Sequence, residues 1–141
     1  MGTCSGYGER DGYFFWTSDA TPAYQLVLPD VASITRTVIT LTRIPAVIVI
    51  DKLVKKTTPS TLQARFYAYN NDGKGSVGTS EEGFSVTRPH ASLRGLAIGG
   101  TGVSVRTALP DIPAAKAAMW PFIEASTARS AKESFLVSVL E

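Results

Sequence analysis

SITRTVITLTRIPAVIVIDKL, residues 33–53, predicts two β-strands joined by a tight turn. Over residues 33–42 the side chains alternate strictly, and both alternating sets include apolar residues, so we expect that strand to be partly covered on both faces. Residues 43–46 contain a proline, which cannot donate to a sheet, and are predicted to form the turn. The run 46–51 is apolar on both faces until it reaches Asp51. This pattern is typical of a strand in the middle of a sheet that is covered on both sides.

Short β-branched or aromatic runs recur along the rest of the chain, bounded by Gly, Pro, Asn, Asp or Ser. Such spacing predicts an all-β fold, and we expect an antiparallel two-sheet β-sandwich of about nine or ten strands. Residues 111–120 (DIPAAKAAMW) show the only helical character and are expected to form a loop with a short helix. The predicted strands are residues 12–17, 33–42, 46–54, 62–69, 83–87, 91–97, 103–107, 118–124 and 134–140.

The composition indicates one globular domain. The chain has 141 residues, 44% of them hydrophobic and 18% charged, which suits a single core. The formal net charge is +2 and the 14 lysines and arginines are scattered, so nucleic acid is not expected as a partner. Lys52, Lys55 and Lys56 are the nearest approach to a basic patch, which either attracts an acidic glycan or lies in a solvated turn.

Neither the cysteine content nor the chain ends indicate a compartment. Cys4, the one cysteine, cannot form an internal disulfide and has no neighbour at metal-ligand spacing. The longest uncharged apolar run, residues 44–50, is too short to cross a bilayer, and residues 1–12 lack the order of a signal peptide. Because both ends lie close to predicted strands, we expect residues 1–141 to be a single domain of a larger multidomain protein.

No motif for nucleotide binding or nucleophilic catalysis is present in the sequence. GKGSVG, residues 73–78, lies between predicted strands and is not followed by a helix, so we interpret it as a hairpin tip. His90 is the only histidine, and neither HxH nor HExxH occurs. We expect a surface or hydrogen-bonded role for His90, the alternatives being proton transfer or metal binding.

Arg36 lies among apolar neighbours in its predicted strand and needs a carboxylate partner if it is buried. Asp51 on the neighbouring strand and Asp19 in the preceding loop are the natural partners. Asp51 is therefore either the start of an active site or the polar end of a buried strand. We favour the second role, with Arg36 and Asp51 as a structural pair.

Aromatic side chains offer flat surfaces for stacking on sugars, although most rings in a small β domain belong to the core or a sheet face. The candidates for glycan contact are Trp16, Tyr24, Tyr67, Tyr69, His90 and Trp120.

Four segments resemble, in order, the β-sandwich region of the heparinase II/III-type polysaccharide lyases. In that family a Gly/Ser-Asp-Ala-Thr-x-Ala-Tyr segment precedes an arginine-bearing strand, a Val/Ile-rich strand ending in aspartate, and a closing strand. The matching segments here are SDATPAY at 18–24, TRTVITL at 35–41, AVIVIDKL at 46–53 and ESFLVSVL at 133–140.

The resemblance implies part of a bacterial protein in which a helical toroid precedes β-sandwich layers and acidic polysaccharide is cleaved by β-elimination. The family's catalytic residues come largely from the toroid, so no catalytic residue is assigned here and the isolated chain is expected to be inactive. The implied partners are the missing N-terminal catalytic domain and an acidic polysaccharide. The implied location is periplasmic or secreted.

Some members of the family hold a structural zinc ion in the sandwich. By resemblance, Asp51 matches an aspartate ligand, and His90 lies in the region of a downstream histidine ligand. The first histidine ligand has no counterpart in residues 33–36. Two ligands hold zinc poorly, so no cofactor is expected, with Asp51 and His90 as the candidates for a structural metal.

The sequence thus predicts a non-catalytic accessory β-sandwich domain of a heparinase II/III-like lyase, which packs on the toroid and lines the glycan cleft. The alternatives are a stand-alone carbohydrate-binding or adhesive module and a purely structural sandwich domain. Aromatic side chains aligned on one sheet face would favour binding, whereas a large apolar patch away from the loops would favour docking to a missing domain.

Overall fold

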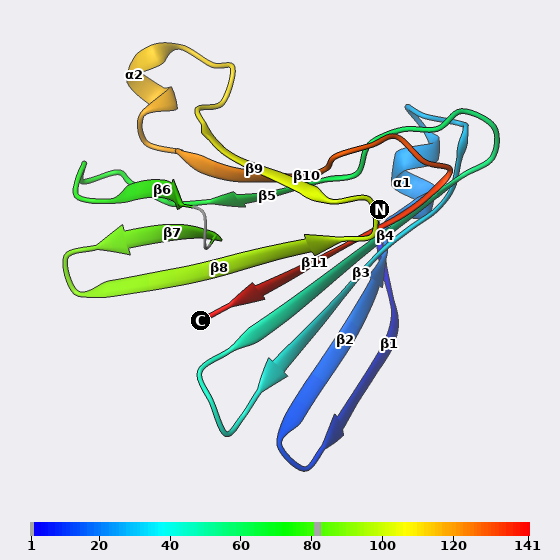
Figure 1. The fold of residues 1–141 in the computed structure, drawn as a ribbon, viewed down its shortest axis with the longest axis horizontal. Helices are drawn as coiled ribbons and strands as arrows, with labels where there is room; N and C mark the ends of the chain where they lie inside the picture. Colours follow the sequence, from blue (N-terminus) through cyan, green and yellow to red (C-terminus); the bar gives the residue numbers. More distant parts are fainter. Residues whose placement is uncertain (1, 81–82) are drawn as a thin grey trace.

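The computed structural model describes residues 2–80 and 83–141, and within these ranges eleven strands form two antiparallel sheets (Figure 1). The predicted two-sheet β-sandwich is therefore confirmed. The larger sheet has the order β1 (Thr3–Arg10), β2 (Tyr13–Asp19), β3 (Val31–Leu41), β4 (Val47–Lys55), β11 (Glu133–Leu140), β8 (Ala91–Gly99), β7 (Gly83–Arg88) and β6 (Ser76–Ser80). The smaller sheet has the order β5 (Gln63–Tyr67), β10 (Phe122–Thr127) and β9 (Val103–Ala108).

Strands β3 and β4 form the hairpin that the sequence predicts. Arg36 lies opposite Asp51 in the register, and the predicted turn at 43–46 separates the strands. The backbone N–H of Leu41 donates to the carbonyl oxygen of Ala46 at 3.0 Å and closes the hairpin. The hairpin therefore aligns the residues of the opening stretch side by side.

Two strands, β1 and β6, were not predicted. β1 (TCSGYGER) and β6 (SVGTS) contain glycines and polar residues in place of the β-branched runs that indicate strands. Both are edge strands, so each needs to fit only one neighbour. Sheet pairing, which the local sequence does not specify, decides their conformation.

Two short helices lie outside the sheets: α1 (Thr21–Gln25) and α2 (Ala114–Ala117). α2 agrees with the short helix expected at 111–120, but the strand predicted at 118–124 starts only at Phe122, because residues 118–120 continue the helical turn until Pro121. α1 was not predicted, since five residues are too few for helical periodicity to show. Among the described residues no helix is long and apolar enough to cross a membrane.

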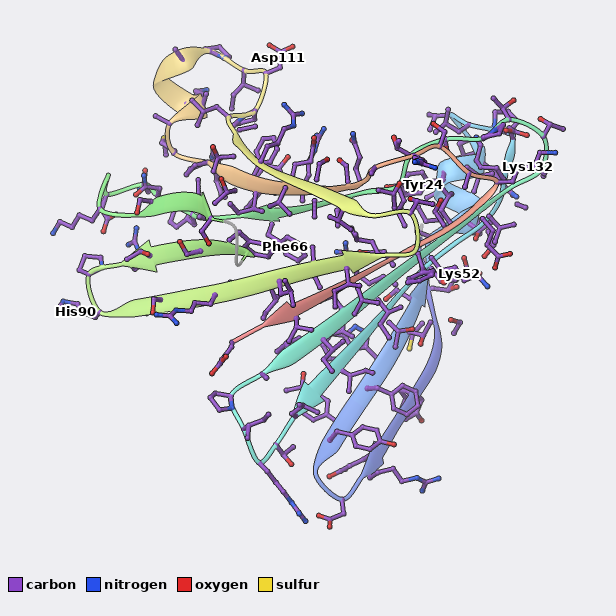
Figure 2. The ribbon with its side chains drawn as sticks, viewed as in Figure 1. Tyr24, Lys52, Phe66, His90, Asp111 and Lys132 are labelled. Atoms are coloured by element: carbon purple, nitrogen blue, oxygen red, sulfur yellow. The ribbon has the colours of Figure 1, made fainter. Side chains whose placement is uncertain are left out.

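The core lies between the two sheets. Its buried cluster joins Leu53 and Leu136 of the larger sheet to Ala64 and Ala125 of the smaller one, with Val31 and Leu62 beside them. Figure 2 shows Phe66 of β5 between the layers, where its ring stacks on Phe84 of β7 at 5.6 Å. Figure 1 shows the smaller sheet above β7, β8 and β11, whereas β1, β2 and β3 extend away from it.

As predicted, β4 lies in the middle of its sheet and the outer side chains of β3 and β4 are partly buried, but among the described residues a second layer covers only one of the two faces. Leu53 and Leu136 show that the smaller sheet covers one face, hereafter the inner face. On the opposite face, Leu96 is 46% exposed and Ile98 is 51% exposed, and no described element packs over them. The sequence pattern is typical of a strand buried on both faces, and packing among the described residues buries only one face fully.

We call this uncovered outer side the open face. Its apolar side chains form two adjacent rows, one across β2, β3, β4, β11 and β8 and one across β4, β11 and β8 only, with one further ring beside them. The first row is Phe15, Ile39, Ile48, Val139 and Leu96; the second ends in Ile50, Val137 and Ile98; the further ring is Phe135. The ion pair between Lys52 and Glu133, 2.8 Å long, borders the face at one end.

Candidate functional site

Arg36 and Asp51 form a two-point ion pair on the inner face. Nε of Arg36 donates to Oδ1 of Asp51 at 2.7 Å, and Nη2 donates to Oδ2 at 3.0 Å. Hydrogen bonding to Asp51 raises the pKa of Arg36 despite its partial burial. Asp19, the other partner considered, accepts instead from the backbone N–H of Thr21 at 2.8 Å. Both oxygens of Asp51 are therefore engaged by one guanidinium group.

The structure does not bring the two candidate metal ligands together. Asp51 lies opposite Leu136, which in turn lies opposite Gly99 at one end of β8. His90 precedes β8 at its other end, nine residues of strand away, which is about 30 Å. In Figure 2, His90 and Lys52, the neighbour of Asp51, lie far apart. Asp51 and His90 cannot share a metal ion, and no group of three or more His, Cys, Asp or Glu gathers among the described residues.

The six candidates for glycan contact divide between several places. Trp16 lies on β2, where it stacks on Phe14 at 6.2 Å, Tyr24 lies on α1, and His90 lies in the turn between β7 and β8. The other three, Tyr67, Tyr69 and Trp120, lie together on the smaller sheet and its continuation. Only this last group brings several candidates onto one surface.

That surface is the outer side of the smaller sheet, which we call the small-sheet face. The pairing of β5, β10 and β9 arranges its side chains in four successive rows. From one end they are Gln63, Ser126 and Ser104; then Arg65, Glu124 and Arg106; then Tyr67, Phe122 and Ala108; then Tyr69 and Trp120. The rows change along the strands from neutral polar groups through charges to aromatic rings, over about 20 Å.

The aromatic rows consist of two tilted pairs. The rings of Tyr67 and Phe122 lie 4.9 Å apart, as do those of Tyr69 and Trp120. The second pair continues the strand pairing beyond β5, because the backbone N–H of Asn70 donates to the carbonyl oxygen of Met119 at 2.9 Å. Tyr67 is 51% exposed and Tyr69 is 56% exposed, so these rings remain available to a ligand.

The charged row is built around Glu124. Its carboxylate accepts from Nε of Arg65 at 2.7 Å and from Nε and Nη2 of Arg106 at 2.8 and 2.6 Å. Its side chain is 1% exposed, whereas those of Arg65 and Arg106 are 47% and 66% exposed. Burial alone would raise the pKa of Glu124, but the hydrogen bonds from Arg106 and Arg65 outweigh it and lower the pKa. Two cations thus cover one hidden anion.

The guanidinium groups are held in place as well as charged. Arg65 Cζ lies 5.1 Å from the centre of the Phe122 ring, a cation–π distance. The hydrogen bond to Glu124 raises the pKa of Arg65. A ligand that meets this row would therefore encounter positioned donors rather than freely rotating side chains.

Sequence reasoning did not identify Arg65, Arg106 or Glu124. One signal was available, because Arg65, Tyr67 and Tyr69 alternate with alanines and the partly buried Phe66 in ARFYAYN. The partners come from β10 and β9, which are separated from β5 by long stretches of chain. Only the pairing of these strands shows that the three charged residues meet.

Comparison with known proteins supports the fold. No protein-family model and no curated protein sequence matches this chain. A crystal structure of heparinase III matches 99% of the chain with a TM-score of 0.71 and 10% sequence identity. A second heparinase III matches with a TM-score of 0.66, and its form with methylated lysines with 0.62, each at 9% identity.

The chain spans 21% of each of these heparinase III chains. It therefore has the fold of about one fifth of heparinase III, and identities of 9–10% carry the likeness no further than the fold.

Proposed function

We propose that the chain is a non-catalytic accessory β-sandwich domain of a larger heparinase-like polysaccharide lyase. The observation that carries this proposal is the match of nearly the whole chain to one fifth of heparinase III. In this proposal the remaining part of the protein performs β-elimination on an acidic polysaccharide. Because such a substrate lies outside the cell, we place the protein in the periplasm or medium of a bacterium.

The open face supports a covering partner in the same protein. Its two rows place five large apolar side chains in one line and three in the next, without a charged residue among them. Contiguous apolar surfaces that remain partly exposed often mark interaction sites in soluble proteins. We assign the remainder of the lyase polypeptide as the partner, since heparinase III has four fifths of its chain beyond the matched part.

The arrangement of titratable groups supports a non-catalytic role. β-Elimination needs a base beside the sugar carbon and a group that neutralises the adjacent carboxylate. His90 lies in an exposed turn, and the buried carboxylates of Asp51 and Glu124 are bound by arginines. The two acids are therefore buried and engaged by arginines, which leaves neither carboxylate free to act as the base on a bound sugar.

Two measurements test the proposal. In the genome, the reading frame around this sequence should continue into a long helical region, and a gene that encodes only sandwich domains would overturn the proposal. The purified chain should release no unsaturated uronate absorbance from heparin, heparan sulfate or chondroitin sulfate. A complete lyase of known activity serves as the positive control, and product formed by the chain alone would show that it is itself catalytic.

A stand-alone carbohydrate-binding module is the second candidate, and the exposed rings and arginines of the small-sheet face favour it. The two candidates differ in what lies beside the domain. A module needs no partner for the open face, so its gene would encode no lyase region.

A further inference from the structure

We propose that the small-sheet face binds an acidic polysaccharide, with the anionic groups on Arg65 and Arg106 and the sugar rings on Tyr69 and Trp120. The proposal concerns this chain's own surface and holds for either candidate function above. Three properties of the face support it: unbalanced charge, fixed donors and exposed rings.

The first property is the charge that a ligand would meet. Arg65 and Arg106 carry two positive charges, and Glu124 carries the single negative charge between them. Because the side chain of Glu124 is 1% exposed, the negative charge lies beneath the guanidinium groups. The outward surface is therefore cationic, and a second anion, carboxylate or sulfate, completes the balance.

The second property is geometry. Glu124 binds both arginines by Nε, and it also binds Nη2 of Arg106, which orients their planar groups before any ligand arrives. Guanidinium groups match the two oxygens of a carboxylate or sulfate group better than lysine does. Because the side chains are already positioned, less rotamer entropy is lost on binding.

The third property is the succession of rows on both sides of the charges. Tyr69 and Trp120, 56% and 39% exposed, provide ring surfaces at one end. Gln63, Ser104 and Ser126 provide amide and hydroxyl groups at the other end, which suit sugar hydroxyls. An extended chain of sugars carrying anionic groups meets all of these rows when it lies along the strands.

Single-stranded nucleic acid also combines phosphates with stackable rings, but it is disfavoured here. Binding along a nucleic acid backbone requires a positively charged groove of several cations. The net charge of the chain is +2, and the charged row contributes only one excess positive charge. Nucleic acid is therefore not the expected ligand, and the experiment below includes single-stranded DNA as the competing ligand.

The test measures binding of the purified chain to heparin, hyaluronan, dextran and single-stranded DNA at physiological ionic strength. We expect binding to heparin and hyaluronan and none to neutral dextran. The double variant Arg65→Gln, Arg106→Gln should lose about tenfold or more in affinity, since each charge-assisted hydrogen bond contributes to binding. The variant Tyr69→Ala should weaken heparin and hyaluronan alike, because stacking does not depend on the anion.

The matched control is Arg43→Gln, Arg94→Gln, which removes two positive charges away from the small-sheet face. If this control lowers affinity as much as the small-sheet variant, binding reflects net charge and the proposal is overturned. Equal binding of dextran, or tighter binding of DNA than of heparin, would also overturn it. Thermal unfolding shows whether each variant is folded. If the double variant is unfolded, Tyr69→Ala and the variants Arg65→Lys and Arg106→Lys decide the question. The two Lys variants should retain part of the affinity.

This experiment is independent of the proposed lyase parent. Glycan binding by the chain is read without any catalytic domain, whereas the parent is read from the gene. Absence of binding with a lyase region in the gene would refute the inference alone, and binding without such a region would refute the proposed function alone.

Discussion

Side chains on β4 and β11 point either toward the smaller sheet or away from it. The set that points toward it is buried although it includes polar residues, and the set that points away is partly exposed although most of it is apolar. The inner set includes Asp51, Ser134 and Ser138, all buried, beside Leu53 and Leu136. The outer set consists largely of the open face, with branched apolar side chains that remain partly exposed. The uncovered face is thus at least as apolar as the covered one, a property that the covering partner proposed above would explain.

The largest expected effect separates two leucines on neighbouring strands. Leu136→Ala should lower the free energy of unfolding by about 3 kcal/mol, because the side chain is fully buried and leaves a cavity. Leu96→Ala removes the same atoms from the open face, where the side chain is 46% exposed, and should cost less than about 1 kcal/mol. Urea unfolding measures both. Equal losses would mean that the open face is covered in the isolated chain.

Two consecutive residues on β4 allow the same comparison for charges. Asp51→Asn weakens the ion pair with Arg36 on the inner face and should cost about 1–2 kcal/mol of unfolding free energy. Lys52→Gln breaks an exposed ion pair with Glu133 on the other face and should change stability by less than about 0.5 kcal/mol. Thermal and urea unfolding of both variants give the ranking, and the reverse order would contradict the assignment of Asp51 to a structural pair.

Acid should destabilise the smaller sheet through Glu124. The pKa of this carboxyl is lowered in the folded state, so its stabilising contribution is complete above the unfolded value of 4.5 and declines as pH falls through the lower folded pKa. Unfolding free energies measured from pH 7 to pH 2 should therefore fall more steeply for the wild type than for Glu124→Gln. Parallel curves would show that Glu124 does not contribute to the pH dependence.

The smallest expected effect on stability accompanies a change in association. Ile98→Lys places a charge on the open face, and should change the unfolding free energy by about 0.5 kcal/mol or less. The same change should reduce self-association and the binding of a hydrophobic dye, because it interrupts the apolar row. Analytical ultracentrifugation and dye fluorescence test this, with Thr87→Lys, a change at an exposed residue of β7, as the control. Unchanged dye binding would argue against an interaction surface.

The sequence predicted the β3–β4 hairpin, including its turn, and it also predicted the pairing of Arg36 with Asp51. Both depend on residues that are close in the chain. It did not predict β1 or β6, whose glycine-containing edges become strands only beside a partner. Nor did it predict the charged row, since Arg65, Arg106 and Glu124 lie on three different strands. Features formed by neighbouring segments were thus predictable, whereas features that depend on strand order were not, because local patterns do not encode that order.

The place of β11 has a further consequence for the order of events during folding. β1 to β4 form one meander and β6 to β8 form another, each from neighbours in the chain. β11 follows every other strand in the sequence, yet it alone joins the two meanders by pairing with β4 and β8. Its pairing with β4 closes a long loop, which slows folding. During synthesis, therefore, both halves of the sheet emerge before the strand that unites them, and the edges of β4 and β8 stay unpaired for that interval.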